Sequence, residues 1–237
     1  SKQLPPTTKD ANGRSYAVGS DGTVLIDDSR AKSILTPLDL PRLAGLPECG
    51  KSHCVAVSAL GEAISWATSA RDGGRYGQLG WGSAHVEAYT PHRIQLGANK
   101  TVKAAAGDDH SAFVDAEGGL WLCGVDRWEQ LGRGAVLWKG GAVWQREPKP
   151  VPALQNVKVI DVACGADHTI ALDAQRRVWA WGRGEHGQLF GASNRPLTAP
   201  PTVSAALSKG FIAKLEALAN RSCTVDAAGG RRCVGRQ

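Results

Sequence analysis

The sequence predicts an all-β protein in which antiparallel, four-stranded sheets repeat around an axis as the blades of a β-propeller. Three observations support this prediction. The chain has 237 residues and is 42% hydrophobic, which is enough for a folded core. One pattern of alternating apolar residues around a central turn recurs in about five copies, at intervals of about 55 residues. Each copy has the period-two alternation of a β-hairpin, and further strands flank it.

Three of the copies carry a histidine at the same position. They are CGKSHCVAVSALGEAISWA (49–67), AGDDHSAFVDAEGGLWLCG (106–124) and CGADHTIALDAQRRVWAWG (164–182). The intervals between His53, His110 and His168 are 57 and 58 residues. Weaker copies at 13–28 and 219–235 keep the alternation without the histidine. The interval between the equivalent Ala17 and Ala56 is only 39 residues, so one blade is trimmed or part of it is missing.

Each repeat is expected to contain four strands. An apolar strand precedes the hairpin, as in TVKAAAG (101–107) and VKVIDVACG (157–165). The hairpin of the fourth copy joins HTIALDA to RVWAWG. A weaker fourth strand is expected in TPHRIQL (90–96) and PKPVPAL (148–154), where proline confines the strand to the edge of a sheet. Four strands per unit, repeated along the chain, describe a propeller.

A second signature follows three of the hairpins. It reads RYGQLGWG, RWEQLGRG and EHGQLFGA, and it places Gln78, Gln130 and Gln188 in register with the histidines to within a few residues. Its glycines are expected to adopt positive φ angles or to allow close packing between blades. The histidines are expected to hydrogen-bond the backbone of a neighbouring blade, because polar groups at blade edges need partners. We therefore interpret the repeated histidines and the repeated glutamines as structural positions of the repeat.

The motifs of common enzymes are absent from the chain. It contains no GxxxxGK[ST], GxSxG or HExxH motif, so we expect no enzyme activity and no cofactor. Its six cysteines form no CxxC pair and no zinc-type spacing, which predicts reduced, half-buried thiols and no bound metal. No stretch is long and apolar enough for a membrane span. The net charge of +6 leaves RNA or another anionic surface as an alternative partner.

The eight tryptophans fall into two groups. Those in the second hairpin strand are expected to fill the space between blades as core residues: Trp66, Trp121, Trp179 and Trp181. The others lie in loops or near the Gln-Leu pair and are candidates for a surface role: Trp81, Trp128, Trp138 and Trp144.

Segments that break the repeat are the candidate binding sites, because propellers present their loops on two faces. The clearest break is an insertion loop at 132–150, which combines aromatic and cationic side chains typical of binding hot spots: Trp138, Lys139, Trp144, Arg146 and Lys149. The alternative is a long loop packed against the rim of the propeller. A second break, at 68–77, contains Arg71, Asp72 and Arg75, and Trp128 is a further candidate.

The order of apolar strand, C/A-G-x-x-H, hairpin, W-x-W-G and G-Q-L-G resembles the regulator of chromosome condensation repeat. The resemblance covers residues 13–235 and implies a β-propeller, whose best-known members have seven blades. This chain shows about five repeats, so it resembles a trimmed or incomplete relative. We expect a single propeller domain at 13–237. The N-terminal segment 1–12 is expected to close the ring, with Gln3 to Thr8 pairing near residues 223–235.

The resemblance implies a non-catalytic scaffold that binds a protein partner or belongs to a multi-subunit complex. The alternative that it implies is a guanine-nucleotide exchange factor for a small GTPase, with the 132–150 insertion acting as a wedge. The absence of methionine and the basic charge would suit a mitochondrial matrix protein or another organellar protein after removal of a transit peptide. The nucleus and the cytoplasm are the alternatives, and the cysteine spacing argues against secretion.

Overall fold

The computed structural model describes residues 7–9, 14–18, 24–28, 33–35, 41–68, 74–82, 91–134, 144–191 and 196–236. In these residues the strands form five antiparallel sheets, of which four have four strands and the last has three. We call them blades 1 to 5 in chain order. The one helix in this part of the chain is η1 (Pro152–Leu154), and no described helix has the length and apolar character to cross a bilayer.

The strands of each blade follow one another in sequence. Blade 1 contains β1 (Thr7–Lys9), β2 (Ser15–Val18), β3 (Val24–Asp28) and β4 (Ser33–Leu35). Blade 2 contains β5 (Glu48–Cys49), β6 (His53–Val57), β7 (Ala63–Ala67) and β8 (His92–Ile94). Blade 3 contains β9 (Thr101–Ala106), β10 (His110–Asp115), β11 (Leu120–Val125) and β12 (Trp144–Pro150). Blade 4 contains β13 (Val159–Cys164), β14 (His168–Asp173), β15 (Val178–Arg183) and β16 (Thr198–Val203). Blade 5 contains β17 (Lys214–Leu218), β18 (Arg221–Val225) and β19 (Arg231–Gly235).

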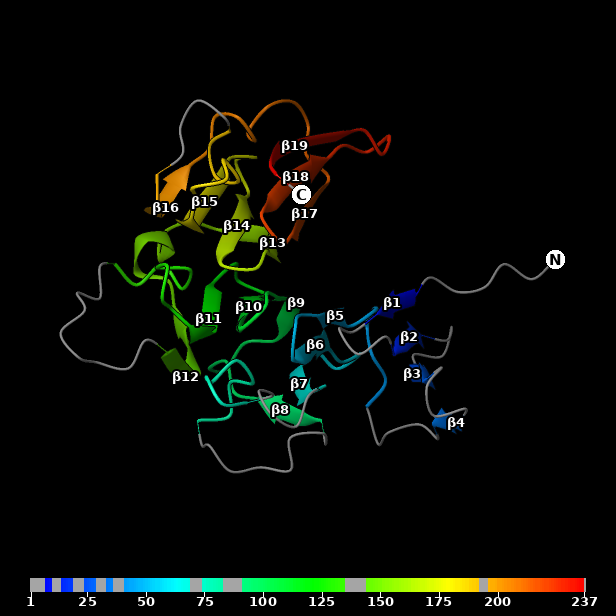
Figure 1. Ribbon diagram of the computed structural model, residues 1–237. Coiled ribbons are helices and arrows are strands. Elements are labelled where there is room, and N and C mark those ends of the chain that lie inside the picture. Colours follow the sequence, from blue (N-terminus) through cyan, green and yellow to red (C-terminus); the bar gives the residue numbers. More distant parts are fainter. Residues whose placement is uncertain are drawn as a thin grey trace.

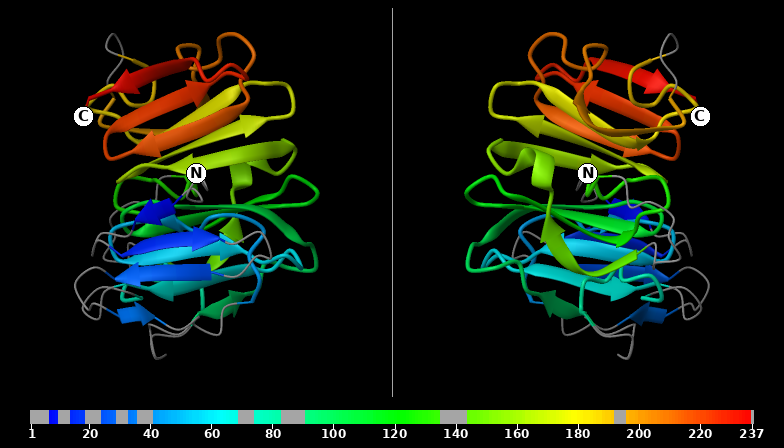
Figure 2. Two further views of the ribbon diagram at one scale, coloured as in Figure 1. Left: turned by 90° about the vertical axis from the view of Figure 1, so that its right-hand side faces the viewer. Right: turned by 90° about the vertical axis from the view of Figure 1, so that its left-hand side faces the viewer.

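The blades stand around a common axis, as the sequence predicts. Figure 1 looks along this axis and shows the first blade in blue at the right and the last in red at the top. The first strands of successive blades contact each other near the centre, β5 with β9, β9 with β13 and β13 with β17. Side views show the sheets following one another from the first two blades at the lower end to the last at the top (Figure 2).

The predicted hairpins and flanking strands are confirmed in the described residues. The expected strands at 101–107 and 157–165 are β9 and β13, and β8 lies within 90–96. The short interval of 39 residues between Ala17 and Ala56 has a simple cause. Only four residues separate β3 from β4, so blade 1 is trimmed in the segment where blades 2 to 4 carry the Gln-Leu signature.

Two expectations about chain organisation are corrected. Residues 144–150 are not part of an insertion loop but form β12, which pairs with β11 as the outer strand of blade 3. The N-terminal strand does not pair with the last blade, because Thr7 and Thr8 pair with Ala17 and Tyr16 of β2. Residues 1–6, which were part of the predicted closure, lie outside the described residues.

The cysteine prediction is wrong for four of the six residues. Cys49 is bonded to Cys54 across β5 and β6, and Cys223 to Cys233 across β18 and β19. The strand register sets both bonds, because each pair lies directly opposite in its ladder. Cys123 and Cys164 are free and buried, and burial raises the pKa of both thiols. The argument against secretion from cysteine spacing is thereby removed.

The tryptophan prediction holds for half of the expected core group. Trp66 and Trp181 are fully buried between blades. Trp121 and Trp179 are only partly buried, and their indole N–H groups donate to the carboxylates of Asp115 and Asp173 at 2.9 Å. Trp179 lies on the same strand face as Trp181 but two residues nearer the hairpin turn, and Trp121 occupies the equivalent position of β11, where the turn supplies an acceptor near the rim.

Candidate partner-binding face

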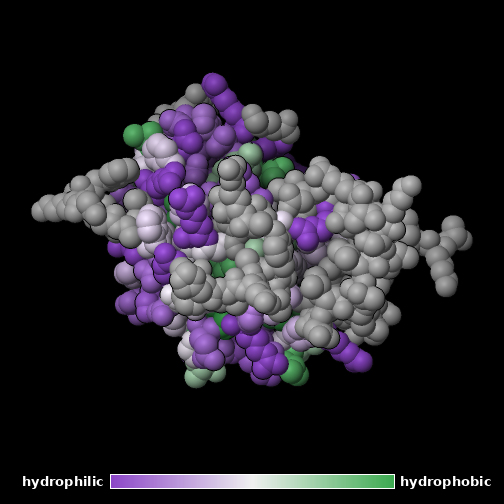
Figure 3. All heavy atoms as spheres, turned by 60° about the horizontal axis from the view of Figure 1, so that its bottom comes forward, coloured by the Kyte–Doolittle hydropathy of each residue, from purple (hydrophilic) through white to green (hydrophobic). Residues whose placement is uncertain are grey.

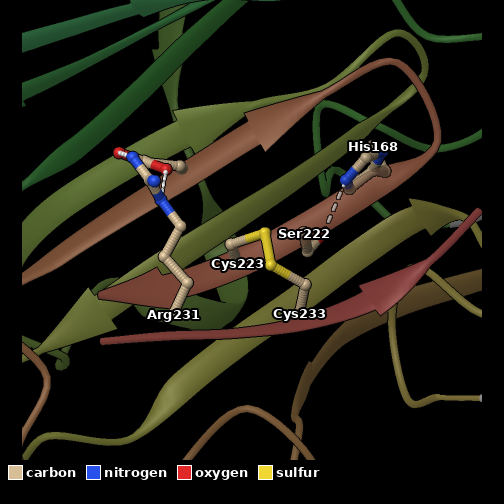
Figure 4. Close-up of a disulfide and its surroundings, with 6 residues drawn as sticks. His168, Ser222, Cys223, Arg231 and Cys233 are labelled. Atoms are coloured by element: carbon tan, nitrogen blue, oxygen red, sulfur yellow. Dashed lines mark hydrogen bonds and ion pairs between the residues drawn. A yellow bond between two sulfur atoms is a disulfide. The ribbon is translucent and has the colours of Figure 1, made fainter. Parts of the chain in front are cut away.

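The three repeated histidines join blade 2 to blade 3, blade 3 to blade 4 and blade 4 to blade 5. His53 Nε2 lies 2.7 Å from Ser111 Oγ, His110 Nε2 lies 3.0 Å from Thr169 Oγ1, and His168 Nε2 lies 2.7 Å from Ser222 Oγ. The contact therefore reaches the neighbouring blade as expected, but through a side-chain hydroxyl and not through the backbone. Figure 4 shows the bond from His168 to Ser222 beside the Cys223–Cys233 disulfide of blade 5.

The hydroxyl groups that contact the histidines also hydrogen-bond the backbone of the Gln-Leu signature. Ser111 Oγ donates to the carbonyl oxygen of Gln78 at 2.7 Å, and Thr169 Oγ1 donates to that of Gln130 at 2.9 Å. Because each hydroxyl hydrogen is used in this bond, the histidine Nε2 must be the donor to the hydroxyl oxygen. The three imidazoles are fully buried, and burial lowers their pKa values, for His53 to about 4 and for His110 and His168 to about 3. They are neutral and out of reach of a substrate, so they do not form a catalytic site.

The glycine in C/A-G-x-x-H is required by the same junction. A Cβ on Gly107 would collide with the His110 imidazole and would lie 2.5 Å from the carbonyl oxygen of Gly165 in the next blade. A Cβ on Gly50 would lie 3.2 Å from Cε1 of His53. The repeated motif thus combines the buried imidazole with the close approach of neighbouring inner strands.

The junction between blades 1 and 2 is built differently. Arg14 occupies the histidine position of blade 1, and its Nη2 donates to the carbonyl oxygen of Thr68 at 2.7 Å. The hydroxyl position of blade 2 is occupied by Cys54, which is held in the disulfide with Cys49. Tyr16 and Trp66 pack beside them with ring centroids 6.0 Å apart. Both partners of the hydrogen bond are thus replaced together at this junction.

The Gln side chains shape the loops that follow β7, β11 and β15. Gln78, Gln130 and Gln188 are buried. Each Oε1 accepts the backbone N–H two residues earlier, from Tyr76 at 3.0 Å, Trp128 at 2.8 Å and His186 at 2.9 Å. The three loops, 74–82, 126–134 and 184–191, follow equivalent strands and lie on one face of the propeller, which we call the Gln-Leu face. Each one holds an aromatic or imidazole side chain at the same place on that face.

An arginine of one blade stacks on the aromatic ring in the Gln-Leu loop of the preceding blade; Arg127 lies in a loop, and Arg183 is the last residue of β15. The Arg127 guanidinium lies 5.8 Å from the centre of the Tyr76 ring, and that of Arg183 lies 4.6 Å from the centre of the Trp128 ring. Cation–π contacts of this kind contribute about 0.5–1 kcal/mol at exposed positions. The stacks therefore join neighbouring blades at the surface, above the buried histidine contacts.

The first stack is part of a larger group, the Tyr76 cluster, which consists of Arg75, Tyr76, Arg127, Trp144 and Arg146. The Tyr76 and Trp144 rings lie 6.2 Å apart at 59°, and the Arg75 guanidinium lies 5.6 Å from the Tyr76 ring centre. The loop and β12 approach closely here, because a Cβ on Gly77 would lie 2.6 Å from Cα of Arg146. Blades 2 and 3 both contribute to the cluster.

Arg133 holds the start of β12 in place beside this cluster. Its Nε donates to Asp126 Oδ2 at 3.0 Å, and its Nη1 donates to Gln145 Oε1 at 2.8 Å. Asp126 Oδ1 also accepts the Leu131 N–H at 2.9 Å. Burial raises the pKa of Asp126, while the Leu131 N–H and Arg133 act in the opposite direction. The network positions the strand that carries Trp144 and Arg146.

The structure brings together only some of the predicted binding residues. Arg75, Trp144 and Arg146 belong to the Tyr76 cluster, and Trp128 lies in the neighbouring stack. Trp138, Lys139, Arg71 and Asp72 lie outside the described residues. Tyr76, Arg127 and Arg183 were not among the predicted binding residues, although an aromatic residue two positions before Gln is a signal that could have identified the first.

Lys149 lies apart from this group. It lines a hollow of ≈ 680 Å³ at the rim between blades 2 and 3, together with Trp81, His92, Trp121 and Glu147. Its Nζ pairs with Glu147 at 3.3 Å, and both side chains are exposed. Lys149 is therefore not part of the Tyr76 cluster.

The described surface has no dominant apolar area in the view of Figure 3, where hydrophilic atoms prevail and hydrophobic ones form small separate spots. The exposed large hydrophobic residues of the described chain are scattered over different segments: Leu60, Val102, Ile160, Leu197, Phe211 and Leu218. The described residues in this view thus form no large contiguous apolar patch of the kind that often marks an interface.

Comparison with known proteins agrees with this architecture. A family model described as the regulator of chromosome condensation (RCC1) repeat matches residues 73–114 and 117–172, and a second model of the same repeat matches 159–188. The Danio rerio protein RCC2 homolog is 31% identical over 176 residues, which are 65% of this chain and 34% of that protein. The RCC1 domain-containing protein RUG3, mitochondrial, of Arabidopsis thaliana is 33% identical over 164 residues, with 68% and 35% covered.

A solved structure, that of human WBSCR16, superposes with a TM-score of 0.77 at 21% identity and covers 99% of this chain and 63% of that one. The chain spans about a third of the length of the two relatives. The strand order, the histidine junctions and the Gln-Leu loops are thus found together with the matching repeat models. The chain belongs to the family of RCC1-repeat β-propellers.

Proposed function

We propose that this chain is a non-catalytic interaction module that holds a protein partner against its Gln-Leu face, as a subunit or assembly factor of a larger complex. The observation that carries the proposal is the row of half-buried aromatic rings and stacked arginines at Tyr76, Trp144 and Trp128. Tryptophan, tyrosine and arginine dominate the binding energy of protein interfaces. The buried histidine junctions hold these side chains on a rigid platform, which reduces the entropy that binding must overcome.

The interaction module is favoured over nucleotide exchange on a small GTPase. The exchange hypothesis assigned the wedge to the insertion at 132–150. Residues 144–150 are the outer strand of blade 3 and pair along β11, so this part is not free to act as a wedge. A wedge would have to come from residues 135–143, which lie outside the described part of the chain.

Affinity capture tests the proposed function. The wild-type chain, a Tyr76→Ala/Trp144→Ala variant and a Phe211→Ala control are immobilised, and the retained proteins are identified by mass spectrometry. Phe211 is a matched control because it also lies under an arginine, Arg176 at 4.5 Å, but outside the Gln-Leu face. We expect one defined set of proteins that the control retains and the double variant loses, with similar melting temperatures. Retention that is equal for all three chains would contradict the proposal.

We further propose an organellar location. The word mitochondrial in the name of RUG3 supports an organelle, and the two disulfides favour an oxidising environment within it. Alkylation of the protein under denaturing conditions, directly after extraction from its native source, tests the second point. Two reactive thiols are expected, those of Cys123 and Cys164, whereas six would place the protein in a reducing compartment.

A further inference from the structure

The two arginine–aromatic stacks of the Gln-Leu face differ in how their charge is balanced. Arg183, which stacks on Trp128, lies 3.4 Å from Asp167 Oδ2 and also pairs with Glu185. The charge of this guanidinium is therefore balanced within the chain. We call this stack closed, because it offers little unbalanced charge to a partner.

In the part of the chain that the structure describes, no carboxylate pairs with an arginine of the Tyr76 cluster. Among the described residues, Arg75, Arg127 and Arg146 take part in no ion pair, and Arg75 and Arg127 are exposed. Nη1 of Arg146 is buried and has no hydrogen-bond acceptor there. A buried donor without an acceptor destabilises a protein, and hydrogen bonds to charged groups are among the stronger ones. An acceptor supplied by a bound partner would satisfy this atom.

The chemistry of the cluster selects the class of that acceptor. Guanidinium groups present a planar fork that matches a carboxylate or phosphate. On the neighbouring loops of the same face, Asp126, Asp167 and Glu185 neutralise Arg133 and Arg183, so the unbalanced positive charge is confined to the cluster and does not continue along the face for a long polyanion. A nucleic acid is therefore disfavoured, and a short segment with a few carboxylates fits the confined cluster of positive charge.

We propose that the Tyr76 cluster recognises a short acidic segment of a protein partner. Its carboxylates pair with Arg75, Arg127 and Arg146, and an aromatic or aliphatic side chain between them packs against Tyr76 and Trp144. This inference rests on the proposed function and names the chemistry of the partner at that face. It also assigns different roles to the two stacks, because the closed stack on Trp128 stiffens the face and the open one binds.

Fluorescence anisotropy with labelled peptides tests the inference. The probe is a peptide in which Asp and Glu flank a central Phe, and its counterpart carries Asn and Gln at the same positions. We expect the acidic peptide to bind at least about tenfold more tightly than the amide peptide, with an affinity that falls as salt increases. An oligothymidylate of equal charge is the third probe. Its tighter binding would overturn the inference in favour of a nucleic acid.

Matched charge variants localise the binding. Arg75→Gln/Arg127→Gln should weaken the acidic peptide by about tenfold or more. Arg42→Gln/Arg236→Gln removes the same charge from two exposed arginines elsewhere and should leave binding within about twofold. Equal losses in the two variants, or no saturable binding of the acidic peptide to the wild type, would overturn the inference.

Different results would contradict the interaction module and the acidic segment. If affinity capture shows a partner that requires Tyr76 and Trp144 but the acidic peptide does not bind, the interaction module stands and the acidic segment is wrong. If the acidic peptide binds through the arginines but no protein is retained, the proposed function is wrong.

Discussion

At the scale of single residues, one turn position shows how the Gln-Leu signature constrains its sequence. The residue before Gln has a positive φ in all three loops, 82° at Gly77, 62° at Glu129 and 79° at Gly187. Blades 2 and 4 have glycine at this position. Blade 3 has Glu129, whose side chain makes the left-handed conformation energetically unfavourable. At Gly77 a side chain is also excluded by space, because an added Cβ would meet the backbone of β12 at Arg146 and Gln145.

Substitutions at this position should have unequal effects. Gly77→Ala places a Cβ 2.6 Å from Cα of Arg146 and from the carbonyl oxygen of Gln145, so we expect the free energy of unfolding to fall by about 2 kcal/mol. Glu129→Gly should change it by less than about 1 kcal/mol, because relief of the left-handed conformation offsets the entropy of glycine. Urea unfolding curves measure both. Similar values for the two variants would contradict the role of β12.

At the scale of elements, the junction between blades 4 and 5 can be measured as a pair. His168 and Ser222 are fully buried and 2.7 Å apart, so the substitutions His168→Ala and Ser222→Ala should not be additive. A double-mutant cycle by urea unfolding is expected to give a coupling energy of about 1 kcal/mol or more. Ser208→Ala combined with Ser222→Ala is a control without this contact and should be additive. A coupling near zero for the first pair would show that the blades are held by packing alone.

At the scale of the whole molecule, the three buried histidines predict a steep acid transition. Their pKa values in the folded state, about 4 for His53 and about 3 for His110 and His168, lie below the unperturbed value of about 6.5. The unfolded state therefore binds more protons, and stability falls as the pH decreases from about 6.5 towards 4. The slope should reach about 4 kcal/mol per pH unit, since each histidine contributes about 1.4. His110→Gln should lower it by about 1.4, and an unchanged slope in urea midpoints would contradict this assignment.

The sequence predicted the repeated elements of the fold well, because each hairpin is local and its pattern is supported by several copies. It failed where geometry depends on a distant partner. The disulfides of Cys49 and Cys223 follow from strand register, which residue spacing does not reveal. The edge strand of blade 3 was expected at 148–154, inside a stretch otherwise taken for a loop, but it begins at Trp144 and ends at Pro150, because prolines and a glycine-rich approach hide its pairing with β11. The candidate face was found only in part, since the stack of Arg127 on Tyr76 joins residues from different blades.

Each buried histidine contact joins a blade only to the one that follows it. The propeller therefore resembles a linear array, in which a weakened joint opens without forcing its neighbours apart. The Tyr76 cluster spans one such joint, since blade 2 supplies Tyr76 and blade 3 supplies Trp144. A ligand bound there would contact both blades at once, so its binding would favour the closed form of that junction. Saturation with the ligand should therefore slow hydrogen exchange of the surrounding backbone amides, because local opening becomes rarer.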